Sequence, residues 1–340
     1  MRSPPHPAAL ASLLLTALAL LPSAPISAAP APASGSSKAV TTATIAYHGW
    51  SDALQLRNAQ VEVVVVPAIG RVMSFRFLDG ENVFWDDRSL DGKRGDSTGK
   101  EWVNFGGDKT WPAPEAEWKN YTGQTKWMPP AAFDSLPVTG RFHGSAIVLT
   151  SPVDPHYGVR THRRIALATD AATLTIETTY ERVSGTPAKI GIWVITQFTE
   201  PVAVYVPIPA RSQFPTGYFA FRDNPWPQLT ARDGLIRLTR DPKDNHKLGS
   251  DADRMLWVGE KALCLVSTPR IAGADYADRG ATAEVYTNPD PKKYVELETL
   301  GPLATLKPGG RISQTNTYVL FRHAAGSDPE TEARRILAVK

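Results

Sequence analysis

The sequence is almost devoid of cysteine, with Cys264 as its single example among 340 residues. One thiol cannot form an internal disulfide, so we expect the fold to depend on its hydrophobic core for stability. Cys264 lies in the apolar run 262–266, where no neighbouring residue in the sequence would lower its pKa. We therefore interpret Cys264 as a buried, inert thiol.

A strong charge of either sign is also missing. The formal net charge is +3, and 37 Lys and Arg residues are interspersed with 34 Asp and Glu residues. This pattern lacks the concentrated basic face of a nucleic-acid-binding protein, so we expect no nucleic-acid partner. The sequence contains no Asp-x-Asp-x-Asp, His-Glu-x-x-His, phosphate-loop or Gly-x-Ser-x-Gly pattern. We expect neither a bound metal nor a cofactor.

Long apolar runs are absent after the N-terminus. The run 8–21 follows Arg2 and precedes Pro22 and small residues at 27–29, the order of a secretory signal peptide. It is shorter than the roughly 20 residues that span a bilayer, which disfavours the alternative of a retained membrane anchor. We predict a signal peptide over 1–29, a flexible leader over 30–45, and a periplasmic or secreted protein with no stable membrane anchor after cleavage.

Strand patterns fill the rest of the chain. Period-2 alternation and β-branched runs occur at 60–66, 71–77, 145–150, 159–167, 173–182, 189–196, 235–238, 294–298 and 315–321. A helix signal is confined to the end, where Asp328 and Pro329 precede a short run to Val339. We predict an all-β domain over 46–325, with a C-terminal helix or tail over 326–340. The lack of a fixed repeat favours a sandwich over a propeller.

Tryptophan is concentrated in one segment. Five of the nine tryptophans are Trp85, Trp102, Trp111, Trp118 and Trp127. The segment 102–118 is rich in Gly and Pro and has no periodicity, which is typical of a loop. Tryptophan rings offer flat apolar faces to sugar C–H groups.

Two glycines and two charged residues follow one another inside this segment. Gly106-Gly107 permits a sharp turn or a close approach of the backbone, and Asp108-Lys109 supplies an acceptor and a donor. We interpret the segment as a carbohydrate-binding loop, with the substrate bound by Asn104, Lys109, Trp111 and Trp118. The alternative is a structural loop in which Asp108 and Lys109 form a local ion pair.

Three further residues are candidates outside that loop. His156 lies in the turn 154–158 and is either a catalytic residue or a surface histidine. Arg71 and Arg160 are either anchors for an acidic sugar or residues on the surface of a strand.

Several segments, taken in order, resemble the galactose mutarotase-like (aldose 1-epimerase-like) superfamily: 67–77, 81–85, 158–167, 174–177, 187–198, 285–287 and 295–299. The run Asn-Phe-Gly-Gly-Asp-Lys-Thr-Trp-Pro at 104–112 further resembles a bacterial subgroup of it. The resemblance covers most of 46–322 and implies a large antiparallel β-supersandwich that acts on, or binds, a carbohydrate ligand.

The resemblance also implies a division of catalytic roles. In this superfamily a glutamate takes the proton of the anomeric hydroxyl while a histidine protonates the ring oxygen. Glu298 matches the glutamate position, although its alternation with Leu297 also fits a solvated strand residue. The histidine position holds Ile195 or Thr196, so the family's acid is missing.

A replacement acid must come from another part of the sequence. Asp108, His156 and Lys109 are the candidates, and burial against tryptophans would raise the pKa of Asp108. Asp108 and Glu298 as a pair would instead suit glycoside hydrolysis.

Three hypotheses remain open at this point. The first is a sugar-active enzyme, an epimerase-like isomerase or a glycoside hydrolase or lyase, and it predicts that Asp108, Lys109, Trp111 and Glu298 converge on one cleft. The second is a noncatalytic carbohydrate-binding module. The third is a structural or interaction protein of the cell envelope.

Overall fold

The computed structural model describes residues 39–96, 98 and 100–338. The predicted signal peptide and residues 30–38 of the predicted leader lie outside this part of the chain. The leader was expected to reach residue 45, and this boundary needs correction. Strand β1 (Thr41–Tyr47) already pairs with β2 (Trp50–Arg57), because its several β-branched residues suit an extended strand.

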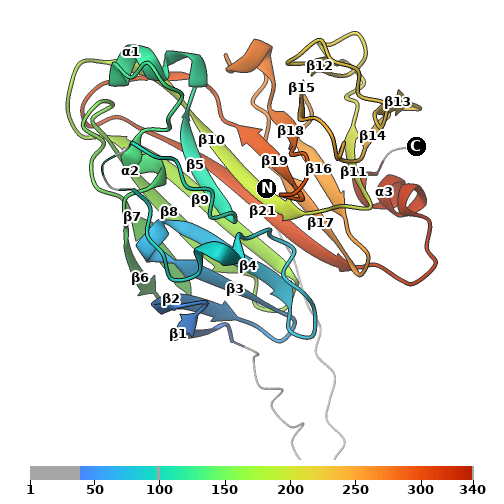
Figure 1. The fold of residues 1–340 in the computed structure, drawn as a ribbon, viewed down its shortest axis with the longest axis horizontal. Coiled ribbons are helices and arrows are strands. Elements are labelled where there is room, and N and C mark those ends of the chain that lie inside the picture. Colours follow the sequence, from blue (N-terminus) through green and yellow to red (C-terminus); the bar gives the residue numbers. More distant parts are fainter. Residues whose placement is uncertain (1–38, 97, 99, 339–340) are drawn as a thin grey trace, which may run out of the picture. The chain divides into compact units, whose positions relative to one another are not determined.

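The described residues form two antiparallel sheets (Figure 1). The first runs in the order β1, β2, β3 (Val61–Val66), β4 (Arg71–Phe77), β5 (Asp108–Ala113), β10 (Ala188–Thr199), β19 (Tyr294–Leu300), β18 (Ala283–Thr287), β15 (His246–Ser250) and β12 (Phe219–Ala220), with β20 (Ala304–Leu306) paired to β10. The second runs in the order β13 (Thr230–Arg232), β14 (Leu235–Leu238), β11 (Ala203–Pro207), β16 (Arg254–Val258), β17 (Ala262–Ser267), β21 (Arg311–Arg322), β9 (Thr173–Arg182), β8 (Val159–Leu167), β7 (Ala146–Thr150) and β6 (Thr139–His143).

Helices in the described residues are short. They are α1 (Trp118–Thr122), α2 (Ala131–Asp134) and α3 (Pro329–Leu337), with single 3-10 turns η1 (Pro67–Ile69), η2 (Arg88–Leu90), η3 (Glu115–Glu117) and η4 (Asp278–Gly280). Asp328 caps α3 by accepting the Thr331 N–H, as its sequence predicts. Ala333 and Leu337 of α3 are buried against β11 and β16. No helix among the described residues is long and apolar enough to cross a membrane.

The two sheets pack face to face, and the main core lies between them. Alternation buries every second residue of β8 and β9, which is why the strands 159–167 and 173–182 were predicted with their observed bounds. The predicted all-β supersandwich with a short C-terminal helix is confirmed.

Strand β5 was not predicted. Segment 102–118 was expected to be a loop, but Asp108–Ala113 pairs with β10 along its whole length. All six residues of β5 are buried, so the strand lacks the alternation that reveals a half-exposed one. The preceding glycines are required by crowding, since a Cβ atom on Gly106 would lie 2.2 Å from the Trp85 carbonyl oxygen.

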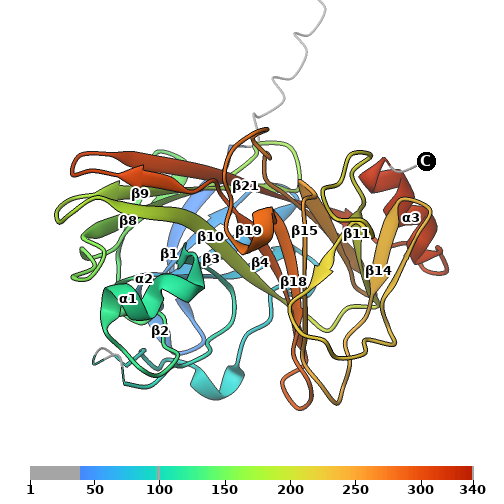
Figure 2. The ribbon, with the colours of Figure 1, turned by 90° about the horizontal axis from the view of Figure 1, so that it is seen from above.

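Two long segments lie on either side of the central strands of the first sheet. Figures 1 and 2 show β5, β10, β19 and β18 between the segment that carries α1 and α2 and the segment that carries β12 to β14. The central strands of the sheet are therefore flanked by one of these segments on each side.

Candidate functional site

The strands β10 and β19 have two chemically distinct faces. The Thr299 hydroxyl accepts hydrogen bonds from Gln314 and Asn316 of β21, so Thr299 points into the space between the sheets. Its neighbour Glu298 must point the other way. We call the side of the first sheet that is turned away from the second sheet the outer face.

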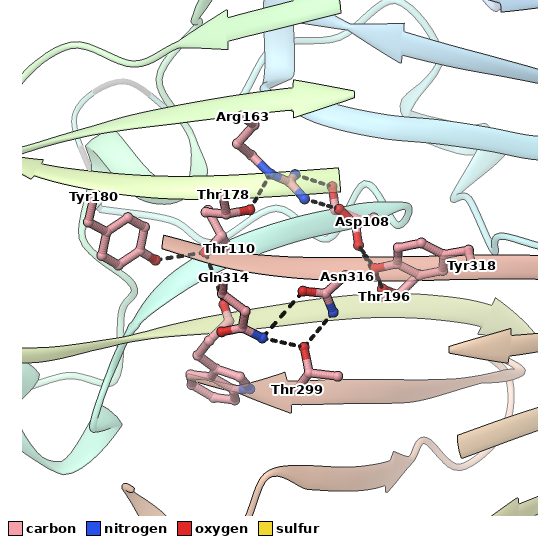
Figure 3. A network of polar contacts seen from close by, with 11 residues as sticks. Asp108, Thr110, Arg163, Thr178, Tyr180, Thr196, Thr299, Gln314, Asn316 and Tyr318 are labelled. Carbon is pink, nitrogen blue, oxygen red and sulfur yellow. Dashed lines mark hydrogen bonds and ion pairs between the residues drawn. The ribbon is translucent and has the colours of Figure 1, made fainter. Parts of the chain in front are cut away.

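Asp108 belongs to the inner side and is fully buried there (Figure 3). Its carboxylate forms an ion pair with Arg163 of β8 and accepts hydrogen bonds from the Thr196 and Tyr318 hydroxyls, at 2.7 and 2.6 Å. Both carboxylate oxygens are therefore engaged with partners from three strands. Asp108 links the two sheets and does not face Glu298, so the structure does not bring these two carboxyls together as a glycosidase pair.

Glu298 is 1% exposed on the outer face, which is not the environment of a solvated strand residue. Its Oε2 accepts hydrogen bonds from Trp193 Nε1 at 2.6 Å and from Lys247 Nζ at 2.9 Å. Its Oε1 is buried and has no hydrogen-bond partner within the described part of the chain. A buried carboxylate oxygen in this state is a strong acceptor, because burial without a partner is costly.

Three further ionisable groups surround Glu298. Lys247 Nζ lies 2.8 Å from Glu284 Oε2, so one ammonium serves two buried carboxyls. Burial lowers the pKa of Lys247, but the charges of Glu284 and Glu298 outweigh it and raise that pKa above its usual range. Burial raises the pKa of Glu284 well above its ordinary value. Burial and the Glu298 charge raise the pKa of Glu296 to about 7.

Lys109 approaches the same face from β5. The backbone register aligns Lys109 with Ile195 and Ile195 with Glu298, so the three residues form one row across three strands. The Lys109 side chain is 2% exposed, and its Nζ lies 4.0 Å from the ring centroid of Trp111 and 5.1 Å from that of Trp102. Burial, aided by the Arg71 charge, lowers the pKa of Lys109 to about 8.

Tryptophans form the wall beside these charges. Trp111 packs edge to face against Trp193, with ring centroids 5.4 Å apart, and its Nε1 donates to Asp134. Trp118 is buried and donates its Nε1 to the Pro112 carbonyl oxygen. Trp127 contacts Trp102, Trp111 and Trp118 and is 49% exposed. We call Trp102, Trp111, Trp118, Trp127 and Trp193 the tryptophan wall.

The remaining predicted site residues lie in three different places. Arg71 is 1% exposed and forms a 2.7 Å ion pair with Asp134, beside the tryptophan wall. Asn104 is buried and caps the turn at Gly106. Arg160 lies on β8 in the second sheet, and His156 is exposed in the turn between β7 and β8. Arg160 and His156 are thus on a different sheet from Glu298.

No role was predicted from the sequence for Lys247, Glu284 or Trp193. Glu284 pairs with Glu298 in the β18–β19 register, and Lys247 comes from the next strand along. In the sequence, Glu284 and Lys247 each look like a single charged residue in a strand, which is also the pattern of a position that faces solvent. Knowing that Glu284 pairs with Glu298 would have identified this charged cluster, but the pairing follows only from the register of β18 and β19. Nowhere in the described ranges do three or more His, Cys, Asp or Glu residues form a group that could hold a metal ion.

Solved structures define the class of this fold. A galactose mutarotase-like protein from Lactobacillus casei matches with a TM-score of 0.56 at 10% identity, over 79% of this chain and 100% of that one. A galactose mutarotase related enzyme from Lactobacillus acidophilus matches with a TM-score of 0.54 at 13% identity, over 81% and 99%. A TPR-domain containing protein from Parabacteroides distasonis matches with a TM-score of 0.53 at 14% identity, over 85% and 51%. The chain therefore has a galactose mutarotase-like fold.

The family itself is identified by its sequence model. Residues 52–321 match the domain of unknown function DUF4380, and the chain belongs to this family. No curated protein matches the sequence.

Proposed function

We propose that this protein binds a carbohydrate on the outer face of the first sheet and acts on it with Glu298 as a general base. The observation that carries the proposal is the asymmetric environment of the Glu298 carboxylate. Trp193 and Lys247 fix one oxygen, while the other is buried and unpaired among the described residues. A base held in one orientation with a free acceptor oxygen is suited to removing a hydroxyl proton.

The reaction that best fits is ring opening of a free sugar, as in an epimerase-like isomerase. Glycoside hydrolysis by Asp108 and Glu298 has less support, because Asp108 is fully engaged with Arg163, Thr196 and Tyr318. Within the tryptophan wall, the half-exposed ring of Trp127 supplies an apolar face for a sugar, while Trp111, Trp118 and Trp193 are buried behind it. Arg71 is already paired with Asp134, so a neutral sugar is a better candidate than an acidic one.

The proposal is tested by measuring mutarotation of freshly dissolved α-D-galactose and α-D-glucose by polarimetry. We expect the wild-type protein to accelerate the reaction of at least one of these sugars. Glu298→Gln keeps the size of the side chain and removes the base, so we expect a loss of at least about 100-fold. Glu177→Gln, an exposed strand glutamate on β9, is the matched control and keeps full activity. Acceleration by Glu298→Gln equal to that of the wild type would refute the role of Glu298.

A noncatalytic carbohydrate-binding module is the second candidate, and the half-exposed Trp127 favours it. A binding module needs the tryptophan wall but no proton transfer. This candidate predicts that the wild type binds sugars without accelerating mutarotation, and that Glu298→Gln binds them equally well.

We also propose that the protein acts in the periplasm or outside the cell. This part rests on the order of charged, apolar and small residues over 1–29. Sequencing the N-terminus of the protein recovered from a bacterial periplasmic fraction tests it. A mature protein that begins near residue 30 supports the proposal, and an intact Met1 in the cytoplasmic fraction refutes it.

A further inference from the structure

Lys109 is a buried cation whose ammonium lies against the rings of Trp111 and Trp102 and not against a carboxylate. Its ammonium forms no hydrogen bond and no ion pair within the ranges described, although the side chain is 2% exposed. The other buried cations nearby are engaged, Arg71 with Asp134 and Lys247 with Glu284 and Glu298. An unpaired buried ammonium is expensive in free energy, so a position that retains one invites a functional explanation.

The position of Lys109 relative to Glu298 supplies that explanation. Because neighbouring strands are about 4.8 Å apart, the Cα atoms of Lys109 and Glu298 lie about 10 Å apart on either side of Ile195. Ile195 is one of the two residues that the resemblance to the superfamily places at its histidine position. A chain of contacts also runs from Lys109 to Glu298. The Lys109 ammonium lies over the Trp111 ring, Trp111 pairs with Trp193, and Trp193 donates a hydrogen bond to Glu298.

We propose that Lys109 is the general acid that works with Glu298, in place of the missing histidine. This inference rests on the proposed function and names its second catalytic residue. Glu298 takes the proton of the anomeric hydroxyl, and the electrons of the O1–H bond form the second bond of the C1 carbonyl. The bond from C1 to the ring oxygen breaks, its electrons stay on the ring oxygen, and the ring oxygen takes a proton from the Lys109 ammonium. Ring closure on the other face of C1 returns both protons, so no oxidant, reductant or co-reactant is needed.

The other candidate acids fit less well. Asp108 faces the inner side of the sheet, and His156 lies on the other sheet. Glu296 is the remaining competitor, because it shares the outer face and Gln197 Nε2 donates to it at 2.6 Å. The experiment must therefore separate Lys109 from Glu296.

Proton donation by Lys109 depends on its neighbours. Arg71 on β4 lowers its pKa, while Asp134 on α2 and Glu296 and Glu298 on β19 raise it, and burial has the largest effect. The resulting value of about 8 leaves the ammonium charged at neutral pH and able to release its proton.

The test compares Lys109→Arg, Lys109→Met and Glu296→Gln in the mutarotation assay, with Lys119→Met on α1 as an exposed control. Arginine keeps the charge but does not give up a proton in proteins. We expect both Lys109 variants to lose at least about 100-fold in rate, and the control to lose nothing. The wild-type rate should fall above pH of about 8, and this alkaline limb should disappear in Lys109→Met. Thermal unfolding confirms that each variant is folded.

The outcomes separate this inference from the function on which it rests. If the wild type accelerates mutarotation and Lys109→Arg retains more than half of the rate, Lys109 is not the acid. If Glu296→Gln alone abolishes the rate, the acid is Glu296 and the inference is overturned. If the wild type accelerates neither sugar, the proposed function fails and the role of Lys109 fails with it.

Discussion

Asp108 and Lys109 are adjacent in the chain, yet β5 directs their side chains to opposite faces of the first sheet. Asp108 contacts Arg163, Thr196 and Tyr318 between the sheets, whereas Lys109 lies on Trp111 at the outer face. The two residues therefore do not form the local ion pair that was one interpretation of the sequence. Their separation predicts that they serve different purposes, Asp108 for stability and Lys109 for chemistry.

Asp108→Asn tests the first of these purposes. The substitution leaves the Arg163 guanidinium buried without its counter-charge, so we expect a loss of about 3 kcal/mol or more in the free energy of unfolding. Urea unfolding measures this loss. The pH dependence of mutarotation should keep the wild-type shape. Full stability together with lost activity would place Asp108 in the site instead.

Lys247→Met should steepen the fall of stability with rising pH. Without the ammonium, Glu284 is a buried carboxyl with no cation at hydrogen-bond distance, and its pKa in the folded state, already raised by burial, should rise further. The folded state then holds protons that the unfolded chain releases above its ordinary pKa of about 4.3, so stability falls as pH rises. Thermal unfolding at pH 5 and pH 8 should show the larger loss at pH 8. Lys247→Arg keeps a cation and is the control, and an equal loss at both pH values would contradict the assignment.

In the wild-type protein, Glu296 should also make stability fall as pH rises, by a smaller amount. Its pKa is raised to about 7 in the folded state, so its contribution to stability falls as pH rises from about 4.3 to 7. Glu296→Gln should reduce this slope, measured as the change in Tm between pH 5 and pH 8. Glu117→Gln, an exposed residue of η3, should leave the slope unchanged. An unaltered slope in Glu296→Gln would show that Glu296 does not hold a proton near neutral pH.

Trp127→Ala separates binding from folding. The ring is half exposed and contacts the tryptophan wall, so its loss should weaken sugar binding about tenfold, or about 1.4 kcal/mol, with little change in Tm. Quenching of tryptophan fluorescence measures the affinity. Ile271→Ala removes another exposed apolar side chain and is the control. Unchanged affinity in Trp127→Ala would exclude this part of the wall from the binding surface.

The sequence predicted the parts of the fold in which one face of a strand is polar. Alternation revealed β8 and β9, and the resemblance to a known superfamily pointed to Glu298. Strand β5 was missed because both of its faces are buried, so its residues carry no alternation, and it lacks the run of β-branched residues that marked the equally buried β3.

The electrostatic part of the site had no signal in the sequence. Glu284 and Lys247 reach Glu298 through the registers of β18 with β19 and of β15 with β18, over separations of 14 and 51 residues. A one-residue shift in either register would turn these side chains to the other face. Local patterns do not specify such registers, which follow from packing of the whole sheet.

The most direct test of the account is a crystal structure of Glu298→Gln with galactose or glucose bound. We predict that the sugar lies against the tryptophan wall, with its anomeric hydroxyl roughly 2.6–3.2 Å from the residue 298 side chain and its ring oxygen on the side of Lys109. A sugar bound elsewhere, for example in the pocket lined by Asn224, Trp226 and His246, would contradict the account. So would the absence of a bound sugar at saturating concentration.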